Sequence, residues 1–180
     1  MRHPATTAHA GFTMIELLVV VAIAGILAAV GIPAMLDTIR SAQLRNATSQ
    51  LYGAIILARS EAVKRNVEVD VQPGTACVYP ASNNSAQWTA GWGVWTTVTT
   101  GGVTACDKQL EQSDATANMT ITADNPGGIG YLPTGRLSNA SARTFTLQST
   151  KSATIPARCI AMNTSGQPSV RTGTAANGCS

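Results

Sequence analysis

The hydrophobic positions of the chain follow two different periods. From Leu17 to Leu36 the sequence holds 20 consecutive residues without a formal charge, the length at which an α-helix crosses the hydrocarbon core of a membrane. After Pro33, hydrophobic residues recur at intervals of three or four, which predicts that the helix continues as an amphipathic segment to about residue 66. The predicted buried stripe consists of Leu44, Ala47, Leu51, Ile55, Ala58 and Ala62.

From Val67 onward the pattern changes to alternation. Residues 67–71 read VEVDV, and four later runs are short, rich in β-branched or aromatic residues and bounded by turn-forming residues. These runs are residues 91–98, 119–123, 143–149 and 158–162. They predict a small, mostly antiparallel β-sheet domain with Trp88, Trp92 and Trp95 in its core rather than in a stacking platform for bases. We therefore expect an α+β fold, in which a long N-terminal α-helix packs on this sheet domain.

The charges of the predicted sheet domain are unevenly distributed. The net charge of the chain is only +3, but residues 67–124 carry one lysine and six acids, a balance of −5, whereas residues 125–180 carry five basic residues and no acid. Basic clusters attract phosphates, so DNA binding is one hypothesis for this region, although charges spread over 36 residues are more typical of solvated surface. The candidate DNA-binding residues are Arg136, Arg143, Lys151, Arg158 and Arg171.

Four cysteines lie beyond the uncharged run, and an even number in a translocated domain indicates disulfides. Four cysteines allow three pairings, with four unpaired buried thiols as the alternative. We favour Cys77–Cys106 and Cys159–Cys179, because sequential pairing closes short loops. No CxxC spacing is present and both histidines precede the uncharged run, which argues against a zinc site.

The sequence offers little for catalysis. Beyond Gly11 the chain has no histidine, so it lacks the usual general base and the usual metal ligand. Asp107, Glu111 and Asp114 form a loose acidic group without EF-hand spacing, which we expect in a solvated loop rather than around a cation. We therefore expect no enzymatic activity, no cofactor and no metal.

Glu16 stands at the head of the uncharged run, where an ionised carboxylate is costly in lipid and needs a partner. The stretch GFTMIELLVVVAIAGILAAVGIP, residues 11–33, resembles the class III leader and N-terminal helix of type IV pilins and type II secretion pseudopilins. The resemblance implies that Gly11 precedes the cut made by prepilin peptidase and that Phe12 becomes the new, methylated N-terminus. It also implies that Gly25 and Pro33 occupy helix-weakening positions.

In such fibres, the resemblance implies, Glu16 neutralises the N-terminal amine of a neighbouring subunit. A carboxylate beside an ammonium in low dielectric is strongly attracted, so this pair would favour docking into an assembly over staying in the bilayer. The expected partners are therefore prepilin peptidase, the inner membrane and other pilin or pseudopilin subunits.

Segments of the sheet domain resemble, in order, the minor pilins and pseudopilins of the GspH/FimT family. The segments are GWGVW at 91–95, IGYLPTGRLS at 129–138, RTFTLQS at 143–149 and ARCIAMNTSGQPSV at 157–170. Some members bind DNA through a C-terminal Gly-Arg-x-Arg loop. The matching place here reads Gly166, Gln167, Pro168 and Ser169, so both arginines are missing and only Arg171 stands nearby.

These observations predict a minor pilin involved in the assembly or priming of a type IV pilus. The alternatives are a type II secretion pseudopilin and a DNA-binding minor pilin for DNA uptake. The expected location is the inner membrane, with a single pass and a periplasmic C-terminal domain, followed by incorporation into the fibre. The expected division is a leader at 1–11, a transmembrane and assembly helix at 12–36, an amphipathic helix at 37–66 and a β-rich globular domain at 67–180.

Overall fold

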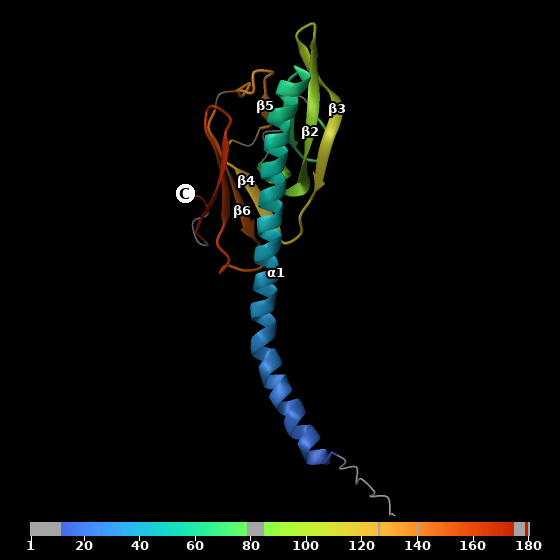
Figure 1. Cartoon of the computed structure of the whole chain (residues 1–180), viewed down its shortest axis with the longest axis vertical. Coiled ribbons are helices and arrows are strands. Elements are labelled where there is room, and N and C mark those ends of the chain that lie inside the picture. The colour runs from blue at the N-terminus through green and yellow to red at the C-terminus, as the bar shows by residue number, and fades with distance from the viewer. Residues whose placement is uncertain (1–11, 79–84, 126, 140, 175–178, 180) are drawn as a thin grey trace, which may run out of the picture. The chain divides into compact units, whose positions relative to one another are not determined.

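The structure, a computed structural model, describes residues 12–78, 85–125, 127–139, 141–174 and 179 (Figure 1). It consists of one long α-helix, one 3-10 helix and eight β-strands among the described residues. The helices are α1 (Met14–Arg65) and η1 (Ser85–Ala90). The strands are β1 (Val69–Pro73), β2 (Gly91–Thr100), β3 (Val103–Asp114), β4 (Met119–Ala123), β5 (Ile129–Tyr131), β6 (Arg143–Ser149), β7 (Arg158–Met162) and β8 (Pro168–Thr172).

The chain divides into two compact units, with the boundary between Thr38 and Ile39 inside α1. In the first unit the large hydrophobic side chains of the helix are exposed, from Met14 to Leu36. Among the described residues, no helix combines the length and the hydrophobicity that a membrane span requires.

In the second unit, α1 buries one face. All six residues of the predicted stripe are buried, and Ala54 and Thr48 extend the buried face. The Thr48 hydroxyl donates to the carbonyl of Leu44 one turn earlier, at 2.7 Å, so its polar atom is satisfied inside the core. After Arg65 the helix stops at Asn66, which has a positive φ of 55°, a conformation common at helix C-termini.

The strands form two antiparallel sheets of four strands each (Figure 1). The first has the order β3-β2-β1-β5, and the second has the order β4-β6-β7-β8. The register pairs Val71 with Val94 in the first sheet and Phe145 with Ile160 in the second. Because side chains alternate between faces, these buried pairs fix one face of each sheet towards the core. The predicted α+β fold and antiparallel pairing are therefore confirmed.

Aromatic residues join the two sheets and η1 in one core. Trp88 of η1 and Trp92 of β2 are fully buried, and the ring of Trp88 meets that of Phe145 edge-on, with centroids 4.8 Å apart and planes at 76°. Trp95 is half-buried. The prediction of a core position is therefore confirmed for Trp88 and Trp92, whereas Trp95 lies outside the buried core cluster.

The five predicted strand segments all contain strands, but three strands were not predicted. These are β3, β5 and β8, which all lie at sheet edges, and β5 has only three residues. The expectation of a solvated loop for Asp107, Glu111 and Asp114 was wrong, because all three lie on β3. An edge strand with one partner can carry solvated charges, which also discourage pairing with other chains.

A buried hydroxyl holds the turn before β8. The Tyr131 hydroxyl donates to the carbonyl of Gly166 at 2.6 Å, and burial raises the pKa of Tyr131 to about 12. Gly166 has a φ of 79°, and a Cβ there would come within 2.7 Å of the Tyr131 ring. This position therefore requires glycine for both its conformation and its close contact.

We expect Tyr131→Phe to lower the free energy of unfolding by about 1–2 kcal/mol, because it leaves the Gly166 carbonyl buried without a donor. The raised pKa means that the folded chain keeps the phenolic proton more strongly than the unfolded chain. Wild-type stability should therefore fall above pH 10, and the variant should lack this component. Urea titrations at pH 7 and pH 11 check both points. Tyr52→Phe, at a half-buried tyrosine of α1, is the matched control. Equal losses of unfolding free energy in the two variants would contradict the role assigned to the Tyr131 hydroxyl.

Candidate assembly site, disulfides and basic surface

The implied processing and assembly residues lie at the start of α1. Gly11 is outside the described residues. Phe12, the next residue, is 87% exposed. The Glu16 carboxylate accepts hydrogen bonds from the backbone N–H and the hydroxyl of Thr13, both at 2.8 Å, and the Glu16 N–H donates to the Thr13 hydroxyl at 3.3 Å.

Thr13 and Glu16 thus form a capping box, in which two side chains satisfy free N–H groups at a helix N-terminus. Sequence reasoning missed this contact, although the Thr-x-x-Glu spacing is its known signature. The contact holds the Glu16 carboxylate close to the backbone that follows Phe12. It therefore places the acid beside the N-terminus that processing after Gly11 would create.

Two further residues of the predicted assembly set lie inside α1. The helix runs without interruption across Gly25 and Pro33. A Cβ added at Gly25 would meet no atom within 4 Å, so the structure of this chain alone gives no packing reason for glycine there.

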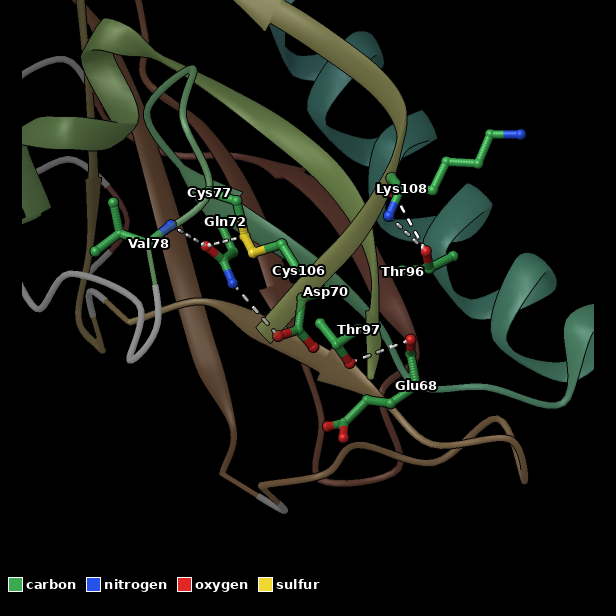
Figure 2. Close-up of a disulfide and its surroundings, with 9 residues drawn as sticks. All are labelled: Glu68, Asp70, Gln72, Cys77, Val78, Thr96, Thr97, Cys106 and Lys108. Carbon is green, nitrogen blue, oxygen red and sulfur yellow. Dashed lines mark hydrogen bonds between the residues drawn. A yellow bond between two sulfur atoms is a disulfide. The ribbon is translucent and has the colours of Figure 1, made fainter. Parts of the chain in front are cut away.

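The first disulfide joins Cys77 to Cys106 of β3, with Cα atoms 6.3 Å apart. Figure 2 shows the buried amide of Gln72 beneath this bridge, where its oxygen accepts a hydrogen bond from the N–H of Val78 at 3.2 Å. The bridge therefore holds the segment after β1 against the edge of the first sheet.

The second disulfide joins buried Cys159 of β7 to Cys179, with Cα atoms 5.6 Å apart. The guanidinium of Arg171 also donates to the carbonyl of Cys179 at 3.1 Å. Both contacts attach Cys179 to the second sheet. The pairing in the structure is the sequential one that the loop lengths favoured, and none of the described cysteines is free.

We expect Cys179→Ser to lower the free energy of unfolding by about 3 kcal/mol, because the bridge closes a loop of 20 residues in the unfolded chain. Adding Cys159→Ala should cost little more, since the cross-link is already lost. Urea titration of the mature chain, with non-reducing peptide mapping of the wild type, is the measurement. Recovery of both thiols free from the wild-type protein would reject this bridge.

The five candidate DNA-binding residues do not form one surface. In the second sheet, Arg158 pairs with Thr172 and Cys159 pairs with Arg171. Since consecutive residues of a strand point to opposite faces, Arg158 and Arg171 lie on opposite faces of the sheet. Arg158 donates to the Thr172 hydroxyl at 2.9 Å. Arg136 and Lys151 are exposed and lie outside the strands.

Arg143 corrects the sequence prediction most clearly, because its side chain is only 3% exposed. One terminal nitrogen donates to the carbonyls of Gly127 and Gly128, at 2.8 and 3.0 Å. Burial lowers the pKa of the guanidinium, and the nearby charge of Asp124 opposes this shift. Arg143 therefore cannot serve as an exposed phosphate contact.

Residues 166–169, which the sequence comparison placed opposite a DNA-binding loop of some similar proteins, form the end of a turn and the start of β8. Gln167 and Ser169, which stand where that loop has arginines, are exposed. The Gln167 N–H donates to the side chain of Asn163 at 2.9 Å, and the Ser169 hydroxyl donates to the carbonyl of Ala161 at 3.2 Å. The turn is thus held by neutral hydrogen bonds.

In the part of the chain that the structure describes, no group of acids, cysteines and histidines could hold a metal.

Comparisons with known proteins agree with this geometry. Residues 47–166 match the family described as Type II transport protein GspH, and residues 7–32 match the Prokaryotic N-terminal methylation motif. Among solved structures, the chain is similar to the type IV minor pilin FimU of Pseudomonas aeruginosa, with 19% identity, a TM-score of 0.55 and coverage of 76% of this chain and 95% of that chain. It is also similar to the minor pseudopilin EpsH from the Type 2 Secretion System of Vibrio cholerae, with 11% identity, a TM-score of 0.50 and coverage of 73% and 97%. No curated protein sequence matches the chain.

At these identities the two solved structures show a shared fold alone. The GspH match is stronger support, because it covers more than half of the chain and runs from α1 to the turn before β8. Pilin-like families of this kind are structural subunits and not enzymes. The chain therefore belongs to the GspH family and is a minor pilin or pseudopilin of a type IV pilus or a type II secretion system.

Proposed function

We propose that this protein is a minor pilin that takes part in the assembly or priming of a type IV pilus. In this proposal prepilin peptidase cuts after Gly11, and residues 12–36 anchor the mature chain in the inner membrane until it enters the fibre. Residues 67–180 then stand in the periplasm, where the two disulfides can form. The N-terminal methylation motif supports the processing step and the membrane stage.

One observation carries the assembly role. The first unit presents a helix whose large hydrophobic side chains are exposed wherever the structure describes them, among them Ile26 and Leu27 at 69% and 68%. A contiguous apolar surface of this size needs a cover. Lipid supplies that cover before assembly, and neighbouring helices supply it in a fibre. Glu16 stands at the head of this surface, and its charge is costly in lipid but favourable beside an amine in a fibre.

A type II secretion pseudopilin is the second candidate. The family name and the likeness to a pseudopilin fold favour it. Deleting the gene and measuring pili and secreted proteins in the same cultures separates the two. Loss of surface pili with normal secretion supports the pilus subunit, whereas loss of secretion with normal pili supports the pseudopilin.

DNA uptake is the weaker alternative. Arg158 and Arg171 lie on opposite faces of the sheet, and Arg143 is buried. The turn at Gln167 is held by neutral hydrogen bonds. The five predicted residues therefore form no continuous surface for phosphates. We expect the mature chain to give no salt-dependent gel shift with duplex DNA that responds to Arg136→Gln or Arg171→Gln.

A further inference from the structure

Two adjoining hollows lie between α1 and the second sheet, both within the second unit. The larger, about 630 Å³, is lined by Arg59 of α1 and by Arg143. The smaller, about 290 Å³, is lined by Arg45 of α1 and by Arg158 of β7. Tyr52 lines both hollows. We call the two together the arginine groove.

The helix side of this groove has a regular spacing. Arg45, Tyr52 and Arg59 are seven residues apart, so they lie nearly above one another on one side of α1. Fourteen residues at 1.5 Å each separate the backbones of the two arginines by about 20 Å. The groove thus offers two basic ends with a half-buried tyrosine between them.

The positive charge of the groove has few partners within the chain. Four arginines and one acid, Asp124, line the two hollows, which gives a balance of +3. Among the described residues, neither Arg45 nor Arg59 makes a salt bridge or a side-chain hydrogen bond, and Arg143 has no carboxylate within salt-bridge distance. The Asp124 carboxylate accepts hydrogen bonds from the N–H groups of Asn125 and Thr144.

Arg143 gives the second, independent observation. Its side chain is 97% buried and lines the larger hollow, yet its Nε has no hydrogen-bond partner among the described residues. A buried guanidinium bonded only to carbonyls is costly, and the nearby charge of Asp124, which also lines this hollow, offsets that cost only in part, because the pKa of Arg143 stays lowered. A second anion in the larger hollow would therefore be attracted by the buried charge of Arg143 and would contact Arg59, the more exposed of the two arginines.

We propose that the arginine groove binds an extended, acidic segment of a neighbouring protein subunit, with one carboxylate at each basic end. An extended chain rises about 3.3 Å per residue, so two carboxylates about six residues apart would span the 20 Å between the ends. The identification of the partner as a subunit of the same fibre rests on the proposed function. The binding of an acidic segment by the groove does not depend on the proposed function.

The walls of the groove favour a protein segment over a nucleic acid. Ile56, Met162, Pro168 and Val170 form apolar surface between and beside the basic ends. Such surface suits the side chains of a peptide, whereas a nucleic acid presents a charged phosphate at every nucleotide, including those that would lie on this apolar surface.

The binding test uses the full mature chain in detergent and a fluorescent peptide with two glutamates six residues apart, separated by alanine and serine. Arg45→Gln with Arg59→Gln should weaken binding at least tenfold. Arg136→Gln with Arg171→Gln, which removes the same charge elsewhere, should change it less than twofold. A peptide with glutamine at both positions should bind at least tenfold more weakly.

Equal binding of the glutamine peptide, equal weakening by the two double variants, or no binding at all would overturn the proposal. A labelled DNA duplex is measured in parallel. Duplex binding that is lost in the groove variant, without binding of the acidic peptide, would identify a nucleic-acid groove instead.

A photocrosslinking residue at Ile56 then identifies the occupant in cells, with Val103 on the β2–β3 hairpin as the control position. We expect Ile56 adducts to map to an Asp- or Glu-containing segment of another pilin-like subunit, and to fall at least tenfold with Arg59→Gln. Adducts with such subunits from Val103 alone would reject the groove and leave the assembly role intact. Absence of pilin-like adducts from both positions would reject the proposed partner together with the assembly role.

Discussion

Glu16→Gln should still be inserted and cut after Gly11, but its incorporation into the fibre should fall at least tenfold. Neither insertion nor cleavage uses the carboxylate charge, whereas the amine of an adjacent subunit would lose its partner in low dielectric. By analogy with broken buried ion pairs, the cost is about 3–5 kcal/mol. The measurement is the amount of variant in sheared pili relative to the amount left in the membrane fraction.

The capping box makes this substitution informative. Glutamine can also fill the acidic position of the box, so Glu16→Gln keeps the helix cap at Thr13 and removes the charge. Thr13→Ala is the matched control, because it removes the cap and keeps the charge. That variant should lose about 1 kcal/mol of helix stability and still enter the fibre. Normal incorporation of Glu16→Gln, or equal loss in both variants, would show that the charge is not used in assembly.

Gly11→Glu should leave an uncut precursor in the membrane. A peptidase site shaped around a residue without a side chain cannot admit a long, charged one, so we expect less than a tenth of the chain to be processed. Intact-mass measurement should find Phe12 at the N-terminus of the wild type and Met1 or Arg2 at that of the variant. Ala8→Glu adds the same charge three residues earlier and should be cut normally. Efficient processing of Gly11→Glu, or a wild-type N-terminus other than Phe12, would contradict the proposed cleavage.

The sequence predicted the elements whose pattern is imposed by burial. The stripe from Leu44 to Ala62 and the alternation in β6 bury one face each, so their periods are visible in the chain itself. β3 and β8 lie at sheet edges, where one side has no partner strand and most residues are exposed. A strand whose residues are mostly exposed needs no regular alternation, so these two sequences resembled loops, whereas β4, also at a sheet edge, buries Met119 and Ile121.

The candidate sites also divide into those that a contiguous sequence motif predicts and those that only the folded chain brings together. The leader motif around Gly11 and Glu16 is contiguous and could be recognised from the sequence, and so could the Thr13 capping signal that was missed. The burial of Arg143 depends on carbonyls at Gly127 and Gly128, which only the folded sheet domain brings to it. The arginine groove likewise combines residues of α1 with residues about a hundred positions later. The count of charges showed that residues 125–180 are basic, but it could not show that Arg143 and Arg158 lie beside arginines of α1.

The most direct test of the central claim is to locate the native protein at its natural abundance. Pili are sheared from cells and separated from membranes, and the chain is quantified in both fractions by mass spectrometry. We expect a mature form beginning at Phe12 in the pili, in substoichiometric amount, and a loss of surface pili when the gene is deleted. Absence of the mature chain from purified pili, with normal piliation of the deletion strain, would contradict the assignment as a pilus subunit.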